Sequence, residues 1–248
     1  MKRSHERTAL VTGAGQGIGA AIARALHAAG LAVAAVDVDA GAAAATAAAL
    51  RGGPPAAGLA ADVRDEQQLE AAFTAAAERL GPVDVVVNNA ARTEAASVWD
   101  VSPEAWDEVL AVNLRGVLFG CRIAGRRMRG RGWGRIINLG SLAGQAGGTV
   151  AGPHYAASKA GIVVLTKIFA QELAAEGVTV NAVAPAAIDG PVMQHLPPDA
   201  VRRARERIPL GRFGTPVEVA ATVAFLASAE AGFITGATVD VNGGLLMR

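Results

Sequence analysis

The sequence predicts one α/β domain built on a doubly wound, seven-stranded parallel sheet. Short apolar runs alternate with Ala-rich helical stretches along the 248 residues. The runs are apolar throughout, which is typical of strands covered by helices on both faces, and helices of ten or more residues separate them. A chain of this length fits one large α/β domain, and no linker or internal repeat divides it. We therefore expect a single domain over residues 1–248.

The expected strands are short runs rich in Val, Ile and Ala that end at turn residues. They span residues 7–13, 31–38, 56–63, 83–90, 133–140, 178–185 and 237–244. The expected helices are the Ala-rich or amphipathic stretches between them. These cover residues 18–30, 41–53, 65–80, 103–113, 114–130 and about 154–176, with a last helix from about 216. Ala is the best helix former, which favours a helix over low-complexity disorder at 41–53.

One stretch, residues 186–215, breaks the alternation of strands and helices. It is rich in Pro, Gly and charged residues. A long connection of this kind in a compact domain is typical of a lid beside a functional site. We expect its apolar residues Val192, Met193 and Leu196 to face inwards and its arginines to face solvent.

Composition excludes several classes of protein. Apolar residues make up 52% and charged residues 18% of the chain, so a large core is possible, and a net charge of +1 gives no general attraction to nucleic acid. The single cysteine, Cys121, indicates a reducing compartment, and we expect the cytoplasm. The first residues lack the apolar core of a signal peptide, and no window predicts a membrane span. No metal site is predicted.

A glycine-rich turn, VTGAGQGIGAA, joins the first strand to the first helix. Gly13, Gly17 and Gly19 lie between a strand and a helix, which is the context of a dinucleotide site. In such a site the pyrophosphate lies on the backbone N–H groups at the start of the helix. Asp37 ends the next strand, where a carboxylate accepts hydrogen bonds from the adenosine ribose and repels the 2′-phosphate of NADP. Asp39 is interpreted as a turn residue.

The segment HYAASK contains Tyr155, the only tyrosine of the chain, and Lys159, one of three lysines. Residues four apart share one face of a helix. An ammonium group within about 4–6 Å favours a phenolate, so Tyr155 is a candidate general acid/base whose pKa Lys159 lowers. An amphipathic tyrosine beside a surface lysine is the alternative interpretation of the same spacing.

Together these motifs resemble the short-chain dehydrogenase/reductase family over nearly the whole chain. The matching segments are TGAGQGIG (12–19), DV (62–63), NNAA (88–91), VNLRG (112–116), INLGSLAG (137–144) and HYAASK (154–159). The resemblance implies a Rossmann fold and an NAD(H)-dependent oxidoreductase that interconverts a secondary alcohol and a ketone. It also implies a homotetramer, in which the helix at 154–176 and the segment 216–243 pack between subunits.

The resemblance also assigns roles to individual residues. Tyr155 would exchange a proton with the substrate oxygen, and Ser141 would hold that oxygen. Lys159 would lower the pKa of Tyr155 and bind the nicotinamide ribose. Asn113 would bend its helix and support a chain of water molecules that carries protons. The implied cofactor contacts are Gly13, Gln16, Gly17, Ile18, Gly19, Asp37, Asp62, Val63, Asn89, Tyr155, Lys159 and Ile188.

Three positions depart from the family pattern. Ala91 replaces the glycine of NNAG, Ala186 replaces a glycine after the sixth expected strand, and Gly190 replaces a threonine that contacts the nicotinamide carboxamide. The last two changes put the grip on the cofactor in doubt.

Two other functions stay open: an NADPH-dependent reductase of 3-oxoacyl groups on an acyl carrier, and a non-catalytic NAD-sensing protein. The arginine run between Arg115 and Arg135 could dock an acidic carrier or form a solvated helix face. His154 and His195 are expected at the surface.

Overall fold

The computed structural model describes residues 7–147, 151–190 and 198–247. Seven strands form one sheet in the order β3-β2-β1-β4-β5-β6-β7, and every neighbouring pair is parallel. The strands are β1 Thr8–Thr12, β2 Ala32–Asp37, β3 Ala56–Ala60, β4 Val83–Asn88, β5 Gly134–Leu139, β6 Val178–Pro185 and β7 Thr238–Val241. The predicted doubly wound Rossmann fold is confirmed.

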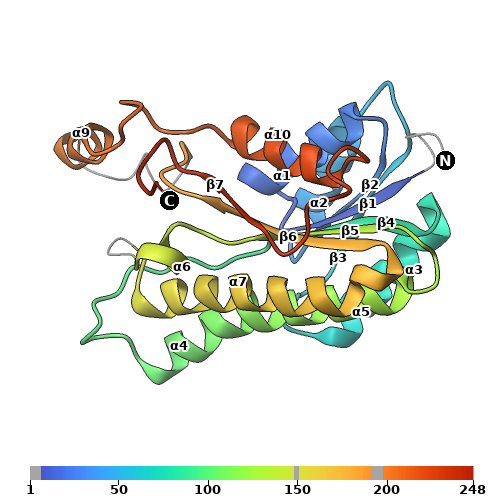
Figure 1. Cartoon of the computed structure of the whole chain (residues 1–248), viewed down its shortest axis with the longest axis horizontal. Helices are drawn as coiled ribbons and strands as arrows, with labels where there is room; N and C mark the ends of the chain where they lie inside the picture. The colour runs from blue at the N-terminus through green and yellow to red at the C-terminus, as the bar shows by residue number, and fades with distance from the viewer. Residues whose placement is uncertain (1–6, 148–150, 191–197, 248) are drawn as a thin grey trace.

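Helices cover both faces of this sheet, as Figure 1 shows. On one face lie α1 Gly17–Ala28, α2 Ala40–Ala49 and α10 Pro216–Ala227. On the other face lie α3 Glu66–Leu80, α4 Pro103–Leu110, α5 Gly116–Met128 and α7 Pro153–Leu173. Each face has its own buried apolar cluster, so the strands are covered on both sides, as their continuous apolar runs predict.

Several element boundaries differ from the sequence-based expectation. A π-helical turn, Ala111–Arg115, joins α4 to α5, and a 3-10 turn, Ala174–Glu176, extends α7. Two short helices are additional: α6 Ala143–Ala146 and, within the expected lid, α9 Pro198–Glu206. The carboxyl ends of all strands lie at one edge of the sheet, and α6 and α9 lie at this edge (Figure 1). We call it the carboxyl edge.

A buried polar network links the sheet to the helices below it. Strand register places Asn88 of β4 beside Asn138 of β5, and Asn88 Nδ2 donates to Asn138 Oδ1 at 2.8 Å. Asn138 Nδ2 in turn donates to Thr166 Oγ1 of α7 at 3.0 Å, and the free thiol of Cys121 contacts both asparagines. Buried polar groups that are fully hydrogen-bonded fix one arrangement of the elements, here the position of α7 against β5.

Close packing of α5 on this network requires a glycine. A Cβ atom at Gly120 would lie 2.0 Å from Asn88 Oδ1, so any larger residue would displace the buried asparagine. Gly120 therefore lets α5 approach β4 closely.

None of the helices in the part of the chain that the structure describes is long and apolar enough to cross a membrane. Within the same residues, no group of three or more His, Cys, Asp or Glu side chains could hold a metal ion.

Candidate active site

The turn between β1 and α1 is shaped by glycine. Gly13 and Gly17 have φ angles of 63° and 55°, in the left-handed region that favours glycine. A Cβ at Gly19 would lie 2.0 Å from the carbonyl oxygen of Gly13, so only glycine permits this close approach. No side chain caps the start of α1, so its first N–H groups point out of the helix as donors for an anionic ligand.

Asp37 lies at the end of β2 and is held in a fixed orientation. The N–H of Gly15 donates to Asp37 Oδ2 at 2.8 Å, and the N–H of Asp39 donates to Oδ1 at 3.1 Å. Asp39 itself caps α2 by accepting from the N–H groups of Gly41 and Ala42, as expected of a turn residue. The structure therefore separates the roles of the two aspartates.

A cleft of about 720 Å³ runs along this part of the carboxyl edge. It brings together ten residues assigned to the cofactor from sequence, namely Gly13, Gln16, Gly17, Ile18, Gly19, Asp37, Asp62, Val63, Asn89 and Ile188. Its volume lies within the usual range for ligand sites, roughly 300–1,000 Å³. The glycine turn, the uncapped start of α1 and Asp37 in this cleft fit a dinucleotide.

Two arginines that sequence reasoning did not assign also line the cleft. Arg64 forms ion pairs with Asp62 at 2.5 Å and with Glu108 at 2.7 Å. Arg92 pairs with Glu94 at 3.0 Å and lies 3.7 Å from Glu108. Hydrogen bonding from Arg64 holds the pKa of Asp62 below its usual range, although burial opposes this effect. Both cations of the cleft therefore already have carboxylate partners.

Tyr155 and Lys159 lie on successive turns at the start of α7, as their spacing predicts. Lys159 is 3% exposed, its Nζ donates to the carbonyl oxygen of Leu139 at 2.7 Å, and Nζ lies 5.5 Å from the centre of the Tyr155 ring. Burial disfavours the charged ammonium and lowers the pKa of Lys159 to about 8.

The pKa of Tyr155 requires a correction to the sequence-based expectation. Burial raises the pKa of this phenol above its usual value, and hydrogen bonding with Ser141 and Thr93 opposes the rise. The physical reason is that desolvation of the phenolate outweighs the neighbouring groups. Thr93 was not predicted, because its place in a loop carries no periodic pattern.

Ser141 follows β5 directly, and its Oγ accepts from the N–H of Ala143 at 3.1 Å. This contact holds the hydroxyl at the carboxyl edge, where it hydrogen-bonds the Tyr155 phenol. Ser141, Tyr155 and Lys159 therefore converge, although none of the three lines the adjoining cleft.

Asn113 is fully buried in the π-helical turn and ties two segments together. Its Nδ2 donates to the Arg92 carbonyl oxygen at 3.0 Å and to Ser158 Oγ at 3.1 Å, and its Oδ1 accepts from the Arg92 N–H at 2.7 Å. Ser158 Oγ in turn donates to the carbonyl oxygen of Tyr155 at 2.7 Å. The side chain thereby anchors the loop after β4 to the helix that carries Tyr155.

The expectation that His154 lies at the surface is wrong. Its side chain is fully buried, and neither ring nitrogen has a hydrogen-bond partner among the residues that the structure describes. The ring packs over Gly152, where a Cβ would lie 2.5 Å from the ring. The Gly152 N–H donates to the Glu94 carbonyl oxygen at 3.1 Å, which ties the loop before α4 to the start of α7. His195 lies outside the described residues.

The segment after β6 carries two of the three departures from the family pattern, Ala186 and Gly190. Ala187 has a φ of 43°, a left-handed conformation that costs a residue with a Cβ roughly 1–2 kcal/mol. Gly190 lines the cleft, and a Cβ there would meet nothing within 4 Å, so the position has room for a larger side chain. The expected inward residues Val192, Met193 and Leu196 lie outside the described residues.

A family model described as Enoyl-(Acyl carrier protein) reductase matches residues 13–246. The chain belongs to the short-chain dehydrogenase/reductase family. This short-chain dehydrogenase/reductase is 44% identical over 239 residues to acetoacetyl-CoA reductase of Rhizobium meliloti (strain 1021), a match that covers 96% of the chain and 98% of the relative. It is 40% identical over 255 residues to human (3R)-3-hydroxyacyl-CoA dehydrogenase, with coverage of 99% and 97%.

A solved structure gives the same result for the fold. This short-chain dehydrogenase/reductase superposes on 3-oxoacyl-[acyl-carrier protein] reductase from Brucella melitensis ATCC 23457 with a TM-score of 0.94. The two share 37% identity, and the match covers 99% of this chain and 93% of the other. The enzyme is therefore an oxidoreductase of this family that acts on a CH–OH group or the corresponding carbonyl.

Proposed function

We propose that the enzyme is an NAD(H)-dependent oxidoreductase that interconverts 3-hydroxyacyl and 3-oxoacyl thioesters of coenzyme A, a secondary alcohol and its ketone. The observation that carries the proposal is the convergence of Ser141, Tyr155 and Lys159 beside a cleft that ends at Asp37. The relatives named as acetoacetyl-CoA reductase and (3R)-3-hydroxyacyl-CoA dehydrogenase support this substrate class.

In this proposal the Tyr155 phenol moves the proton. During reduction it donates its proton to the carbonyl oxygen, and during oxidation its phenolate takes the proton of the hydroxyl group. The raised pKa of the buried phenol keeps it protonated at neutral pH, which suits the reductive direction. Ser141 donates a hydrogen bond to the substrate oxygen and so stabilises developing negative charge there. The bound nicotinamide supplies or accepts the hydride.

Lys159 and Asn113 support this chemistry without touching the reacting carbon. The ammonium group of Lys159 stabilises negative charge on the phenol and would hydrogen-bond the nicotinamide ribose. Asn113 holds the loop after β4 against α7, so it positions Tyr155 relative to the cleft. We also propose that Asn113 supports a chain of water molecules that carries protons between the site and solvent.

Cofactor choice is proposed from the charges at the adenosine end of the cleft. The oriented carboxylate of Asp37 would accept hydrogen bonds from the ribose hydroxyls, and it would repel a 2′-phosphate. Gln16 in the glycine turn is uncharged, and Arg64 is already paired with Asp62 and Glu108. These charges favour NAD over NADP.

We expect kcat/KM with NADH to exceed kcat/KM with NADPH by at least about tenfold, which corresponds to about 1.4 kcal/mol. Steady-state kinetics with acetoacetyl-CoA and each cofactor measure this ratio. Asp37→Ala combined with an introduced arginine should relax it, because repulsion is removed and a phosphate partner is added. Equal rates with the two cofactors in the unmodified enzyme would contradict the assignment of Asp37.

The NADPH-dependent reduction of acyl-carrier thioesters stays the second candidate. It is favoured by the likeness to the Brucella reductase and by 43% identity over 165 residues to 3-oxoacyl-[acyl-carrier-protein] reductase FabG of Thermotoga maritima. Docking of an acyl carrier is disfavoured, because most arginines of the run 115–135 already form ion pairs with carboxylates of the same chain. The pairs are Arg122–Glu66, Arg127–Glu70, Arg131–Asp84 and Arg129–Glu172. A turnover assay would also separate either enzyme from an NAD-sensing protein.

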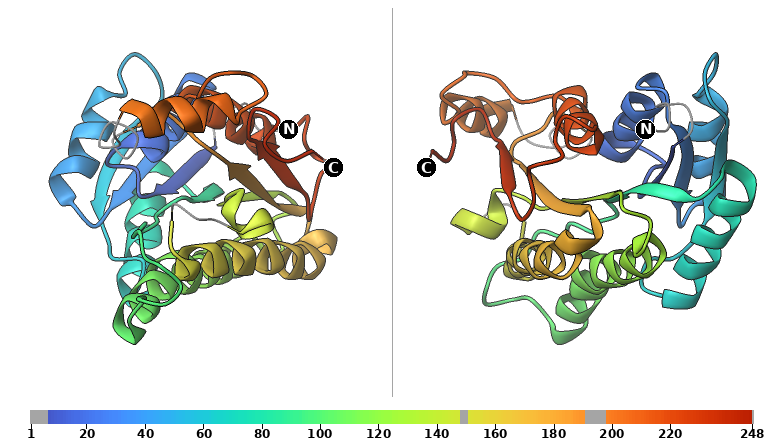
Figure 2. Two further views of the ribbon diagram at one scale, coloured as in Figure 1. Left: turned by 90° about the vertical axis from the view of Figure 1, so that its left-hand side faces the viewer. Right: turned by 45° about the vertical axis from the view of Figure 1, so that its right-hand side comes forward.

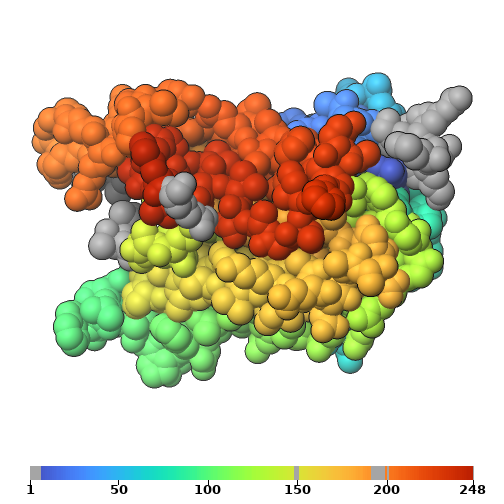
Figure 3. Space-filling view, viewed as in Figure 1, coloured from blue at the N-terminus to red at the C-terminus, as the bar shows by residue number. Residues whose placement is uncertain are grey.

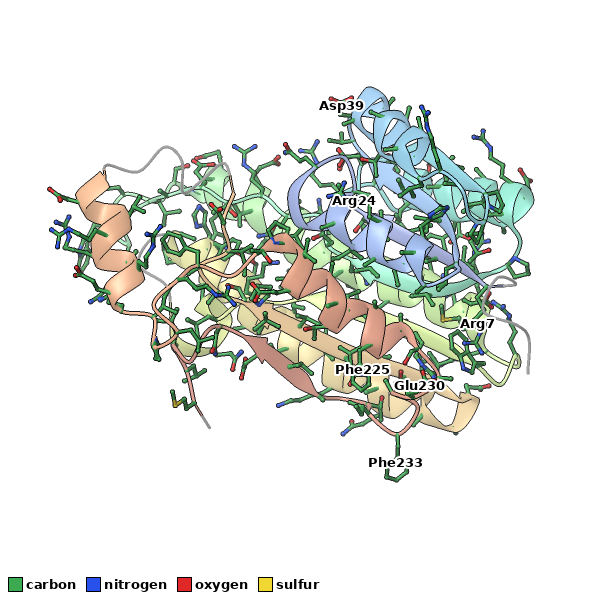
Figure 4. The ribbon with its side chains drawn as sticks, turned by 90° about the horizontal axis from the view of Figure 1, so that it is seen from above. Arg7, Arg24, Asp39, Phe225, Glu230 and Phe233 are labelled. Carbon is green, nitrogen blue, oxygen red and sulfur yellow. The ribbon has the colours of Figure 1, made fainter. Side chains whose placement is uncertain are left out.

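We also propose a homotetramer, for which exposed apolar side chains give support. Val164 and Ile168 on α7 are 56% and 48% exposed. Phe225 on α10 is 50% exposed, and Phe233 in the following loop is fully exposed and points away from the ribbon (Figure 4). Sedimentation should show a tetramer at micromolar concentration. A stable, active monomer would contradict this assembly.

A cytoplasmic location is proposed from the cysteine content. Cys121, the only cysteine, is free and buried. Reducing compartments keep thiols in this state, and a fold that needs no disulfide is suited to them.

A further inference from the structure

The segment of residues 198–212 concentrates positive charge at the carboxyl edge of the sheet. It holds five arginines and two carboxylates, whereas the whole chain has a net charge of +1. Its helix α9 stands out from the body at this edge, and so does the segment that leads into α4 (Figures 1 and 3). Figure 2 shows α9 at the same end of the molecule from two further directions. Positive charge therefore gathers at the end where the catalytic residues lie.

Some arginines of this segment already form ion pairs with carboxylates, and others do not. Arg202 pairs with Asp199 at 3.3 Å and with Glu206 at 3.1 Å, and Arg212 pairs with Glu218 at 2.6 Å. Three others are exposed and have no carboxylate partner among the described residues. They are Arg203, Arg205 and Arg207. These three guanidinium groups are available to an anion from solution.

One of these arginines is fixed beside the cofactor cleft. The guanidinium of Arg205 lies 5.5 Å from the ring centre of Phe213, which is itself buried. Arg205 lines a cavity of about 300 Å³ together with Arg212 and Thr215. Asp189 lines both this cavity and the cofactor cleft, so the two spaces adjoin. The cavity thus places Arg205 beside the cofactor cleft.

We propose that Arg205, which lines the cavity, binds a phosphate group of the coenzyme A part of the substrate, and that the exposed Arg203 and Arg207 of the same segment add positive charge around it. This inference rests on the proposed function for its substrate class, and it adds the residues that recognise the carrier. Coenzyme A ends in a 3′-phosphorylated ADP, and the planar guanidinium fork binds phosphate oxygens in pairs. Exposed cations at the mouth of a site also attract a polyanionic substrate from solution. The acyl end of the same molecule would then reach Tyr155.

The test compares a thioester that carries these phosphates with one that lacks them. For the double variant Arg203→Gln/Arg205→Gln, we expect the KM for acetoacetyl-CoA to rise at least about tenfold, with unchanged kcat. The KM for the acetoacetyl thioester of N-acetylcysteamine should stay the same. Added salt should raise the first KM and leave the second unchanged, because exposed charges are screened.

A matched control removes two arginines from the opposite edge of the sheet. Arg79 and Arg126 are exposed, have no ion pair among the described residues, and lie near the ends of α3 and α5, which precede the amino ends of β4 and β5. Arg79→Gln/Arg126→Gln lowers the net charge equally and should leave both KM values unchanged. Equal effects of the two double variants on acetoacetyl-CoA would overturn the proposal.

Direct binding tests the site without turnover. Calorimetry with adenosine 3′,5′-bisphosphate, in the presence of saturating NADH, should show binding that Arg203→Gln/Arg205→Gln weakens at least about tenfold. Unaltered binding, or equal changes in KM for both thioesters, would overturn the proposal. So would loss of activity only with a thioester on an acyl carrier protein. An enzyme that reduces neither thioester contradicts the proposed function, while the calorimetric result still decides on the arginines.

Discussion

Tyr155→Phe should lower kcat at least about a hundredfold and leave NADH binding intact, because it removes only the group that transfers the proton. The phenol is buried and hydrogen-bonds with Ser141, and phenylalanine fills almost the same volume. The fold should therefore survive the change. Steady-state kinetics give kcat, and NADH fluorescence gives the dissociation constant. If kcat stays within a few fold of the unmodified enzyme, another group carries the proton.

The titration of Tyr155 can be followed directly, because the chain has no other tyrosine. Ultraviolet absorbance of the protein alone should give an apparent pKa above the usual value of about 10, since burial raises it. A value below 10 would show that the phenolate is stabilised within the protein itself. The direction of the shift thus separates desolvation from activation by Lys159.

Lys159→Met should lower kcat/KM for alcohol oxidation about a hundredfold. At the 5.5 Å between Nζ and the centre of the Tyr155 ring, a unit charge contributes about 3 kcal/mol in a medium of effective dielectric constant about 20. Oxidation needs the phenolate, which this charge stabilises, so oxidation should suffer more than reduction. Kinetics in both directions measure the difference. Equal losses in the two directions would leave Lys159 with a role in cofactor binding only.

The same variant tests the low pKa of Lys159 through stability. Burial lowers this pKa from 10.5 to about 8, so between these pH values the unfolded chain binds more protons than the folded protein. The contribution of Lys159 to the free energy of unfolding therefore rises with pH across this window, by about 3 kcal/mol in all. Below pH 8 Lys159 is protonated in both the folded and the unfolded state, so its contribution to the free energy of unfolding does not change with pH.

Other groups titrate in this range and act in the opposite sense. The pKa of Cys121 is raised from 9.0 to about 12 and that of Tyr155 is raised too, so above pH 9 both groups make stability fall. The difference between the unmodified protein and Lys159→Met cancels these contributions. Urea unfolding at pH 7.5, 8.5 and 9.5 should show this difference growing in favour of the unmodified protein. A difference independent of pH would mean that Lys159 keeps its ordinary pKa.

The sheet could be predicted because each strand is an uninterrupted apolar run between turn residues. The ends of the strands were harder to predict. β3, for example, ends at Ala60, before the turn in which Asp62 Oδ1 accepts a hydrogen bond from the Arg64 N–H. α9 was not predicted, because it is short, mostly polar and charged, and has too few apolar residues to mark a buried face. The π-helical turn around Asn113 depends on bonds to Arg92 and Ser158, which are distant in the sequence.

The candidate site was predictable where spacing alone sets geometry. Tyr155 and Lys159 converge because a helix brings positions four apart to one face. Thr93, Arg64 and Arg92 come from loops, and no periodicity places a loop side chain. The burial of His154 was missed for a related reason: its polarity suggested exposure, whereas packing against Gly152 decided its position.

The isolation of Cys121 has a consequence for chemical modification. Its thiol is buried among Asn88 and Asn138, and burial raises its pKa to about 12. Since the thiolate is the form that reacts with maleimides, iodoacetamide or peroxide, this sulfur is inert in the folded protein. A cysteine introduced at an exposed position such as Phe233 would be the sole reactive thiol. A fluorophore attached there would report on contacts at that position without any background from the native sequence.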